Sequence, residues 1–252
     1  MTPTTNRSDA SDAGEDATHE ARSPSGPRIA RVEVLRDEAA TRGATDGFLH
    51  LQRLVVQNVY EDGSTSNAYP CDIVSRRCVD AVTVVLFDQK DGRVRVGLRE
   101  NLRVPVWLRR QSDKVLFADD PRLDTMLETV AGVIEPEDRS TDVRTALRTR
   151  AAAEAREEVG IEVAPTAIHD LGGASFPSPG ITDEKVFFAA AQVDLDAAKP
   201  AHGDGSVMEE VGGLVILDLT EAITRCRDGR IADMKTEIAL LRLRDRLDAG
   251  LA

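Results

Sequence analysis

Three glutamates near the middle of the chain have the type and spacing of a metal site. Glu154, Glu157 and Glu158 lie in the stretch AAAEAREEVGIEV at residues 151–163, and Gly160 closes the glutamate run. On a helix, positions i, i+3 and i+4 share one face, so the three carboxylates would lie together. Mg²⁺ and Mn²⁺ prefer oxygen ligands and commonly bind substrate phosphates as well. The cluster could therefore hold a divalent metal and present it to a phosphate.

The same glutamates also fit a purely structural role. Arg150 and Arg156 are close enough in sequence to form ion pairs with them on a solvated helix surface. The carboxylates alone fit both a metal site and a solvated helix surface, so the surrounding segments are needed to choose between them.

The helix that must carry the glutamates is the clearest element of the sequence. It is predicted over residues 139–159, where the interior is rich in Ala, Arg and Glu. Ser140 or Thr141 is expected to cap its start, and Gly160 is expected to end it.

Apolar segments with strand patterns precede and follow this helix. They lie at residues 28–35, 48–60, 80–88, 93–99, 125–135, 184–195 and 212–219, and further helices are predicted at 220–229 and 234–250. Asp91-Gly92 predicts a hairpin turn. Strands, a helix, more strands and terminal helices in this order favour an α+β fold with α/β/α layers around a sheet.

The chain divides into three regions. Residues 1–27 are polar, poor in apolar side chains and predicted to be a disordered acidic tail. Residues 28–79 are predicted to form a β-rich extension. Residues 80–252 are predicted to form the domain that carries the glutamates.

Composition argues against several functional classes. The 252 residues have a net charge of −12 and no visible basic footprint, so a nucleic-acid partner is not expected. No apolar run approaches the roughly 18 residues of a membrane span, and no signal peptide is predicted. Three cysteines without zinc-like pairing are typical of reduced thiols in a cytoplasmic protein.

The segments around the glutamates resemble the Nudix hydrolase family. Its signature, the Nudix box, is a glycine, five residues, a glutamate, seven residues, and then Arg-Glu-aliphatic-x-Glu-Glu-x-Gly-aliphatic. Gly132 in ETVAGVIEPED corresponds to the opening glycine, and residues 154–161 correspond to the closing half. The resemblance spans roughly residues 80–219 and implies the Nudix fold, an α/β/α sandwich around a mixed sheet.

Three positions depart from that signature. Ala153 stands where the family has an arginine that orients the glutamates, and Arg150 or Arg156 could substitute for it. Asp138, beside Glu137, replaces the first glutamate of the box. Fourteen residues rather than seven separate Asp138 from Ala153. Seven extra residues are about two helical turns, so an earlier helix start would leave the metal-binding face unrotated.

The resemblance implies the metal ligands and the catalytic acids. Glu154, Glu157, Glu158 and the Ala131 carbonyl would bind Mg²⁺, with Mn²⁺ as an alternative. Glu157 and Glu158 would also be catalytic. The family's general base is a late-loop glutamate, which predicts a catalytic role for Glu209 or Glu210 in AHGDGSVMEEVGG. A solvated acidic loop is the alternative for that segment.

Further motifs resemble the ADP-ribose and nucleotide-sugar pyrophosphatases within the family. Pro177 follows the box by 16 residues, as in the ADP-ribose group, and Asn101 and Arg103 correspond to its Gln-aromatic-Arg stretch. The resemblance implies substrate contacts from Arg103, Glu128, Pro177 and Gly180. A surface arginine, a strand-end acid and a simple turn are the structural alternatives for these residues.

The function expected from this resemblance is Mg²⁺-dependent hydrolysis of a pyrophosphate bond. The substrate would be ADP-ribose or a related nucleoside diphosphate sugar, and the products a nucleoside monophosphate and a sugar phosphate. A catalytically weak nucleotide sensor and an enzyme for another diphosphate, such as GDP-mannose, are the alternatives. The strands before Asp80 resemble a dimerising N-terminal sheet, so a homodimer is expected.

Overall fold

The computed structural model describes most of the chain, and its strands form two separate sheets. The described residues are 29–37, 48–109, 112–119, 123, 125–138, 142–199 and 213–250. The expected tail at residues 1–27 and the expected general bases Glu209 and Glu210 lie outside these ranges. Within them, no helix is long and apolar enough to cross a membrane.

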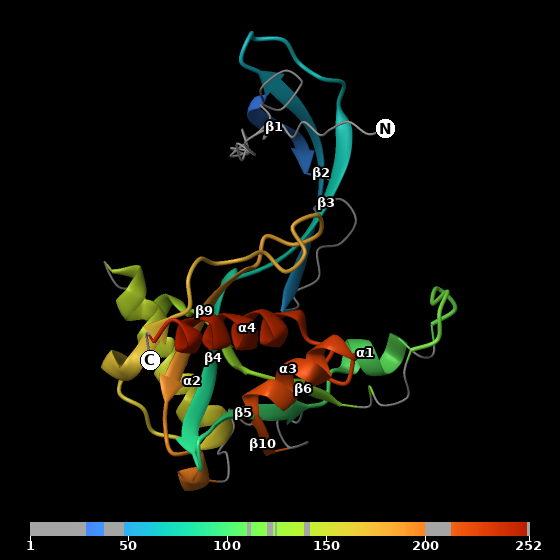
Figure 1. The fold of residues 1–252 in the computed structure, drawn as a ribbon. Coiled ribbons are helices and arrows are strands. Elements are labelled where there is room, and N and C mark those ends of the chain that lie inside the picture. The colour runs from blue at the N-terminus through green and yellow to red at the C-terminus, as the bar shows by residue number, and fades with distance from the viewer. Residues whose placement is uncertain are drawn as a thin grey trace, which may run out of the picture.

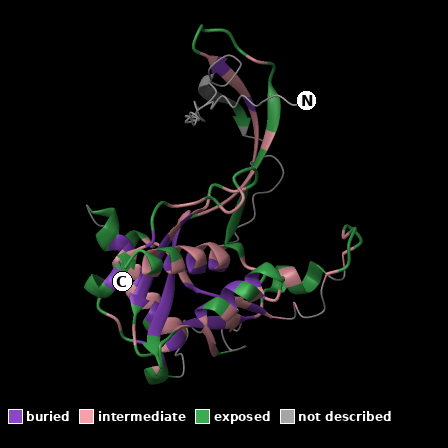
Figure 2. Cartoon of the chain, in the orientation of Figure 1, coloured by how far each residue is buried: buried purple, intermediate pink, exposed green. Residues whose placement is uncertain are grey.

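The first sheet contains three antiparallel strands in the order β1-β2-β3. β1 (Ile29–Asp37) and β2 (Leu49–Tyr60) match two predicted apolar segments, whereas the sequence pattern does not predict β3 (Tyr69–Arg76). Figure 1 shows this sheet projecting from the main body. Few residues of the projection are buried (Figure 2), and in β2 only Val56 and Val59 are.

The second sheet is mixed and forms the main body. Its path is β10-β5-β4-β9-β8, with β6 paired to β5 and β7 paired to β4. The strands are β4 (Asp80–Lys90), β5 (Arg93–Asn101), β6 (Met126–Glu128), β7 (Val130–Val133), β8 (Ile168–Asp170), β9 (Lys185–Gln192) and β10 (Leu214–Asp218). β4 and β9 run parallel, and the other pairs are antiparallel.

The hairpin between β4 and β5 forms at the predicted turn. Asp91 and Gly92 both have positive φ, 53° and 73°, as a two-residue type I′ connection requires. This turn sets the register in which Lys90 faces Arg93 and Leu86 faces Gly97.

Helices cover both faces of the second sheet. They are α1 (Val104–Arg109), α2 (Val143–Val159), α3 (Leu219–Arg227) and α4 (Met234–Asp248), with 3-10 turns at Pro136–Asp138, Pro165–Ala167 and Leu195–Ala197. α2, α3 and α4 coincide with predicted helices, whereas the sequence pattern predicts no helix at α1 and no strand at β8. The three layers confirm the predicted α+β fold class.

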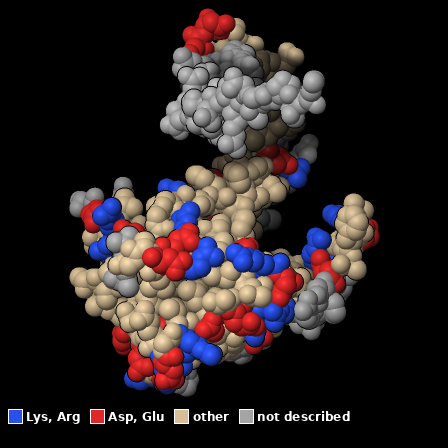
Figure 3. All heavy atoms as spheres, in the orientation of Figure 1, with Lys and Arg blue, Asp and Glu red and all other residues tan. Residues whose placement is uncertain are grey.

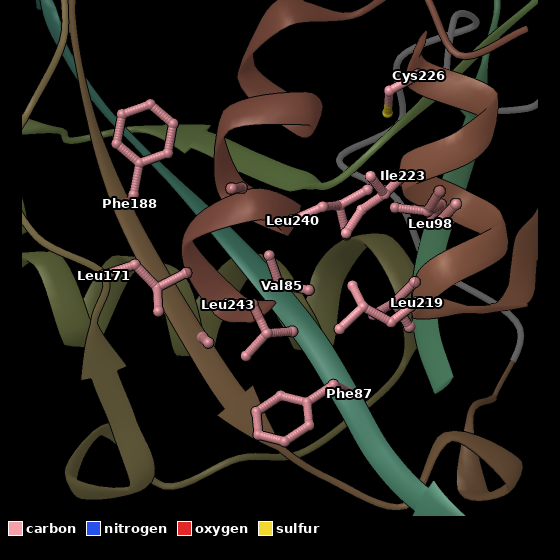
Figure 4. Close-up of a cluster of buried hydrophobic side chains, with 14 of the residues drawn as sticks. Val85, Phe87, Leu98, Leu171, Phe188, Leu219, Ile223, Cys226, Leu240 and Leu243 are labelled. Carbon is pink, nitrogen blue, oxygen red and sulfur yellow. The ribbon is translucent and has the colours of Figure 1, made fainter. Parts of the chain in front are cut away.

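The apolar side chains of β4 alternate between two cores because successive residues of a strand point to opposite faces. Val84 and Leu86 pack against α2. Val85 and Phe87 pack against α3 and α4, as Figure 4 shows. The central strand therefore fixes the glutamate helix on one face and the C-terminal helices on the other.

The ends of α2 explain where the glutamates sit along it. Gly160 has φ 64°, and its N–H binds the Arg156 carbonyl, which confirms the predicted stop. The predicted cap at Ser140 or Thr141 is wrong. Asp142 is the N-cap, because its carboxylate accepts the backbone N–H groups of the first turn.

The two sheets are joined along the loop before β9. The Val74 N–H donates to the Ile181 carbonyl at 2.8 Å, and the Ser75 hydroxyl donates to Asp183 at 2.9 Å. Farther along, Arg76 donates to Glu184 at 2.6 Å. The last residues of β3 are thereby held against the main body.

Candidate active site

A cavity of about 400 Å³ brings together residues that are far apart in the sequence. Arg103, Glu128, Ala131 and Pro177 line it, and all four are predicted site residues. They come from the segment after β5, from β6, from β7 and from the loop before β9. We call this space the β7–α4 cavity, because the first residues of α4 close its other side.

Glu154 occupies space that a side chain at position 132 would take. A Cβ on Gly132 would overlap the Glu154 carboxylate, and Gly132 itself lines the β7–α4 cavity. The opening glycine of the box therefore seats this carboxylate against β7, beside the Ala131 backbone. Of the three glutamates, Glu154 has its place fixed by direct packing against the strand.

Arg150, one turn before Ala153, holds the Glu154 carboxylate. Its guanidinium donates to Asp138 at 2.8 Å and to Glu154 at 3.4 Å. Burial acts to lower the Arg150 pKa, but the hydrogen bond to Asp138 and the nearby charges of Glu154 and Glu157 outweigh burial and raise it. Arg150 thus links Asp138, which stands where the box has its first glutamate, to Glu154 in the closing half of the box.

Arg156 does not share this role. It donates to Glu157 at 3.2 Å, and its side chain is 57% exposed. Between the two arginines that the sequence left open, the ion pairs favour Arg150 as the residue that orients Glu154.

Glu157 is more exposed than Glu154, whose side chain is 13% exposed. The Glu157 side chain is 39% exposed. The negative charge of Glu158 is among the causes that raise the Arg103 pKa, after the hydrogen bond to Glu128 and the charge of Glu128. Within the described ranges, no three acidic, histidine or cysteine side chains already converge as a metal site.

A buried polar chain connects the end of α2 with the cavity. Arg99, which is 2% exposed, donates to the Glu158 carbonyl and to the Asn101 side chain. Asn101 donates to Glu128 at 3.2 Å, and Arg103 donates to both Glu128 oxygens. Buried polar groups need such partners, so the chain sets where Glu128 and Arg103 lie.

Among the described predicted residues, Glu154, Glu157, Glu158 and Gly180 do not line the β7–α4 cavity. Gly180 lines a neighbouring hollow between β3 and the loop before β9, together with Cys71 and Phe176. Conversely, sequence reasoning missed Arg76, Glu184 and the first residues of α4, all of which line the β7–α4 cavity. No local pattern marks them, because only the fold brings them together.

Comparisons with known proteins agree with this architecture. The chain is 29% identical over 183 residues to a GDP-mannose pyrophosphatase of Yersinia enterocolitica, covering 73% of this chain and 82% of that protein. It is 28% identical over 180 residues to an ADP-ribose pyrophosphatase of Haemophilus influenzae, covering 71% of each. No family model matches the chain.

A solved structure supports the fold. The crystal structure of an ADP compounds hydrolase aligns with a TM-score of 0.53 and 16% identity, covering 92% of this chain and all of that one. The fold is that of the Nudix hydrolases. The two relatives support the predicted resemblance to the ADP-ribose and nucleoside diphosphate sugar pyrophosphatases and the expected enzyme class, and the solved structure confirms the expected fold.

Proposed function

We propose that the protein hydrolyses the pyrophosphate bond of ADP-ribose or a related nucleoside diphosphate sugar with Mg²⁺. The products are a nucleoside monophosphate and a sugar phosphate. The observation that carries this proposal is the Glu154 carboxylate seated at Gly132, next to a cavity that contains the Arg103–Glu128 pair. Relatives that act on GDP-mannose and on ADP-ribose support the substrate class.

The donor set fits a hard divalent cation. Glu154, Glu157 and Glu158 would hold Mg²⁺ or Mn²⁺ together with the Ala131 carbonyl, all of them oxygen donors. The space left by Gly132 is the feature of this chain that admits the first of these carboxylates beside β7. When bound, such an ion neutralises the diphosphate and activates a water molecule.

The remaining residues bind and orient the substrate. Arg103 is held by Glu128 through two nitrogens, so its guanidinium is positioned before a phosphate arrives. Glu128 and Pro177 contact the nucleotide from the cavity wall, and Gly180 shapes the adjoining loop. Glu209 or Glu210 is the general base.

The whole chain has three parts in this proposal. Residues 1–27 are a tail, residues 28–79 are the extension through which two copies form a homodimer, and residues 80–252 are the catalytic domain. The described part of the extension exposes the apolar side chains Leu35, Phe48, Leu49, Leu51 and Tyr69, which supports a homodimer. The enzyme works in the cytoplasm, where its cysteines remain reduced.

A substrate panel tests the proposed activity. ADP-ribose, GDP-mannose and other nucleotide sugars are incubated with Mg²⁺ or Mn²⁺, and release of the nucleoside monophosphate is followed. Glu157→Gln is expected to lower kcat by at least about 100-fold, because it removes a metal ligand. Glu162→Gln, an exposed glutamate just beyond Gly160, is the matched control and is expected to keep wild-type turnover.

The outcomes separate the alternatives. Equal turnover in wild type and Glu157→Gln would remove Glu157 from the mechanism. Binding of ADP-ribose without any product would favour a nucleotide sensor over an enzyme.

A further inference from the structure

The start of α4 forms one wall of the β7–α4 cavity. Asp233, Met234 and Lys235 all line it, opposite residues of β6 and β7. The N-cap Asp233 also contributes, through its charge, to the raised pKa of Arg103, after the hydrogen bond of Arg103 to Glu128. The first turn of α4 therefore shares the electrostatic environment of the proposed phosphate-binding arginine.

Buried hydroxyl groups fix this turn to the strands of the site. Thr236 is fully buried, and its hydroxyl accepts the Thr129 N–H at 2.8 Å and donates to Asp233 at 2.7 Å. The Thr129 hydroxyl is 2.6 Å from that of Thr83 in β4. Because Thr129 directly follows Glu128, the position of Lys235 is tied to that of the Glu128–Arg103 pair.

Lys235 enters the cavity as a cation with spare donors. Its ammonium donates to Asp233 at 2.7 Å, and its side chain is 25% exposed. An ammonium has three N–H donors, so this single ion pair leaves the group able to bind another acceptor. Asp233 also accepts from the Thr236 N–H, which holds the carboxylate, and through it the lysine, in one orientation.

Arg76 supplies a second cation from the other sheet. It lines the same cavity and donates to Glu184 at 2.6 Å. Its Nε is buried without a hydrogen-bond partner in the described part of the chain. A buried donor without an acceptor is costly, and a ligand oxygen would relieve that cost.

We propose that Lys235 and Arg76 bind a phosphate group of the diphosphate substrate, in addition to Arg103. This inference rests on the proposed pyrophosphatase function and adds two substrate contacts from α4 and β3. Each of the three cations forms an ion pair with a different carboxylate. These carboxylates reduce the repulsion among the three positive charges that line the cavity. The cavity volume of about 400 Å³ lies within the range of small-molecule sites.

The test compares Lys235→Met and Arg76→Met with wild type. Each variant is expected to raise KM for ADP-ribose or GDP-mannose about tenfold and to change kcat less than about threefold, because a charge-assisted hydrogen bond to substrate is lost. Lys235→Arg keeps the charge and is expected to restore most of the affinity. Lys90→Met is the matched control, because Lys90 forms a similar ion pair with Asp196 outside the cavity.

A binding measurement without turnover keeps the inference independent of catalysis. Calorimetric titration of each protein with the same nucleotide sugars in EDTA is expected to show the same tenfold loss for both methionine variants, with unchanged thermal unfolding. If wild type binds but cleaves nothing, the proposed activity fails while this comparison still decides the roles of Lys235 and Arg76. Affinities within twofold of wild type in both variants, or no binding by wild type, would overturn the inference.

Discussion

Gly132 has no side chain, and this leaves the space that the Glu154 carboxylate occupies. The Glu154 carboxylate fills the volume where a Cβ would stand, and Arg150 donates a hydrogen bond to it. The colliding atoms belong to the end of a flexible side chain rather than to the backbone. A methyl group at this position would therefore displace a proposed metal ligand while disturbing the fold little.

Gly132→Ala is expected to lower the Mg²⁺-dependent turnover about 100-fold, since a misplacement of about 1 Å at a reacting centre has an effect of this size. The free energy of unfolding should change by less than about 1 kcal/mol. Kinetics with varied Mg²⁺ and urea unfolding measure the two effects. Gly173→Ala is the control, because a Cβ there would meet no atom within 4 Å. Wild-type activity in Gly132→Ala would contradict the proposed role of Glu154.

At the scale of the element, α4 depends on the ionised Asp233 at its start. Burial acts to raise the pKa of this carboxyl, but the Lys235 charge and the hydrogen bonds from Lys235 and Thr236 outweigh burial and lower it below 3.8. A carboxyl with a lowered native pKa stabilises the fold above its unfolded pKa. That stabilisation is lost as the pH falls through the native pKa.

Asp233→Asn is expected to lower the free energy of unfolding at pH 7 by about 1–2 kcal/mol, because the amide cannot pair with Lys235. The difference from wild type should shrink as the pH falls from 3.8 through the lower native pKa of Asp233, because the folded wild-type carboxyl becomes protonated there. Urea unfolding at a series of pH values measures it. Asp245→Asn, at the exposed end of α4, should change stability by less than about 0.5 kcal/mol. A difference that stays constant down to acid pH would argue against the ionised cap.

At the scale of the whole molecule, the two sheets differ in how they are stabilised. The second sheet has cores on both faces, whereas the first projects from the body and buries little (Figures 1 and 2). Lys, Arg, Asp and Glu are interspersed over the visible face of the main body (Figure 3), as expected of a solvated surface. The exposed apolar side chains of β2 are instead consistent with the proposed homodimer contact.

The double variant Leu49→Lys, Leu51→Lys is expected to convert a dimer into a monomer, because it places two charges on one face of β2. Light scattering coupled to size-exclusion chromatography measures the mass. Leu116→Lys with Phe117→Lys, which changes two exposed apolar residues between α1 and β6, is the control and should leave the dimer intact. A monomeric wild type, or a variant that remains dimeric, would exclude this contact.

Local sequence was sufficient where a few neighbouring residues decide the geometry. Asp91-Gly92 predicted the hairpin because both residues tolerate positive φ, and Gly160 predicted the end of α2 for the same reason. Near α2, the competing capping residues Ser140 and Thr141 were one or two positions too early. Several neighbouring polar residues could each cap the helix, and the packing of the helix determines which of them is the N-cap.

The sequence by itself determined most of the strands and helices, though not β3, β8 or α1, and it determined the glutamate spacing and the resemblance that indicated the enzyme class. Only the tertiary structure decided that Arg150 rather than Arg156 holds Glu154, that Gly180 lines a different hollow, and that Lys235 and Arg76 face the same cavity as Arg103. Helix and strand periods are set by the backbone over a few residues. The cavity instead depends on which faces of the central sheet the distant segments pack against, and no local pattern carries that information.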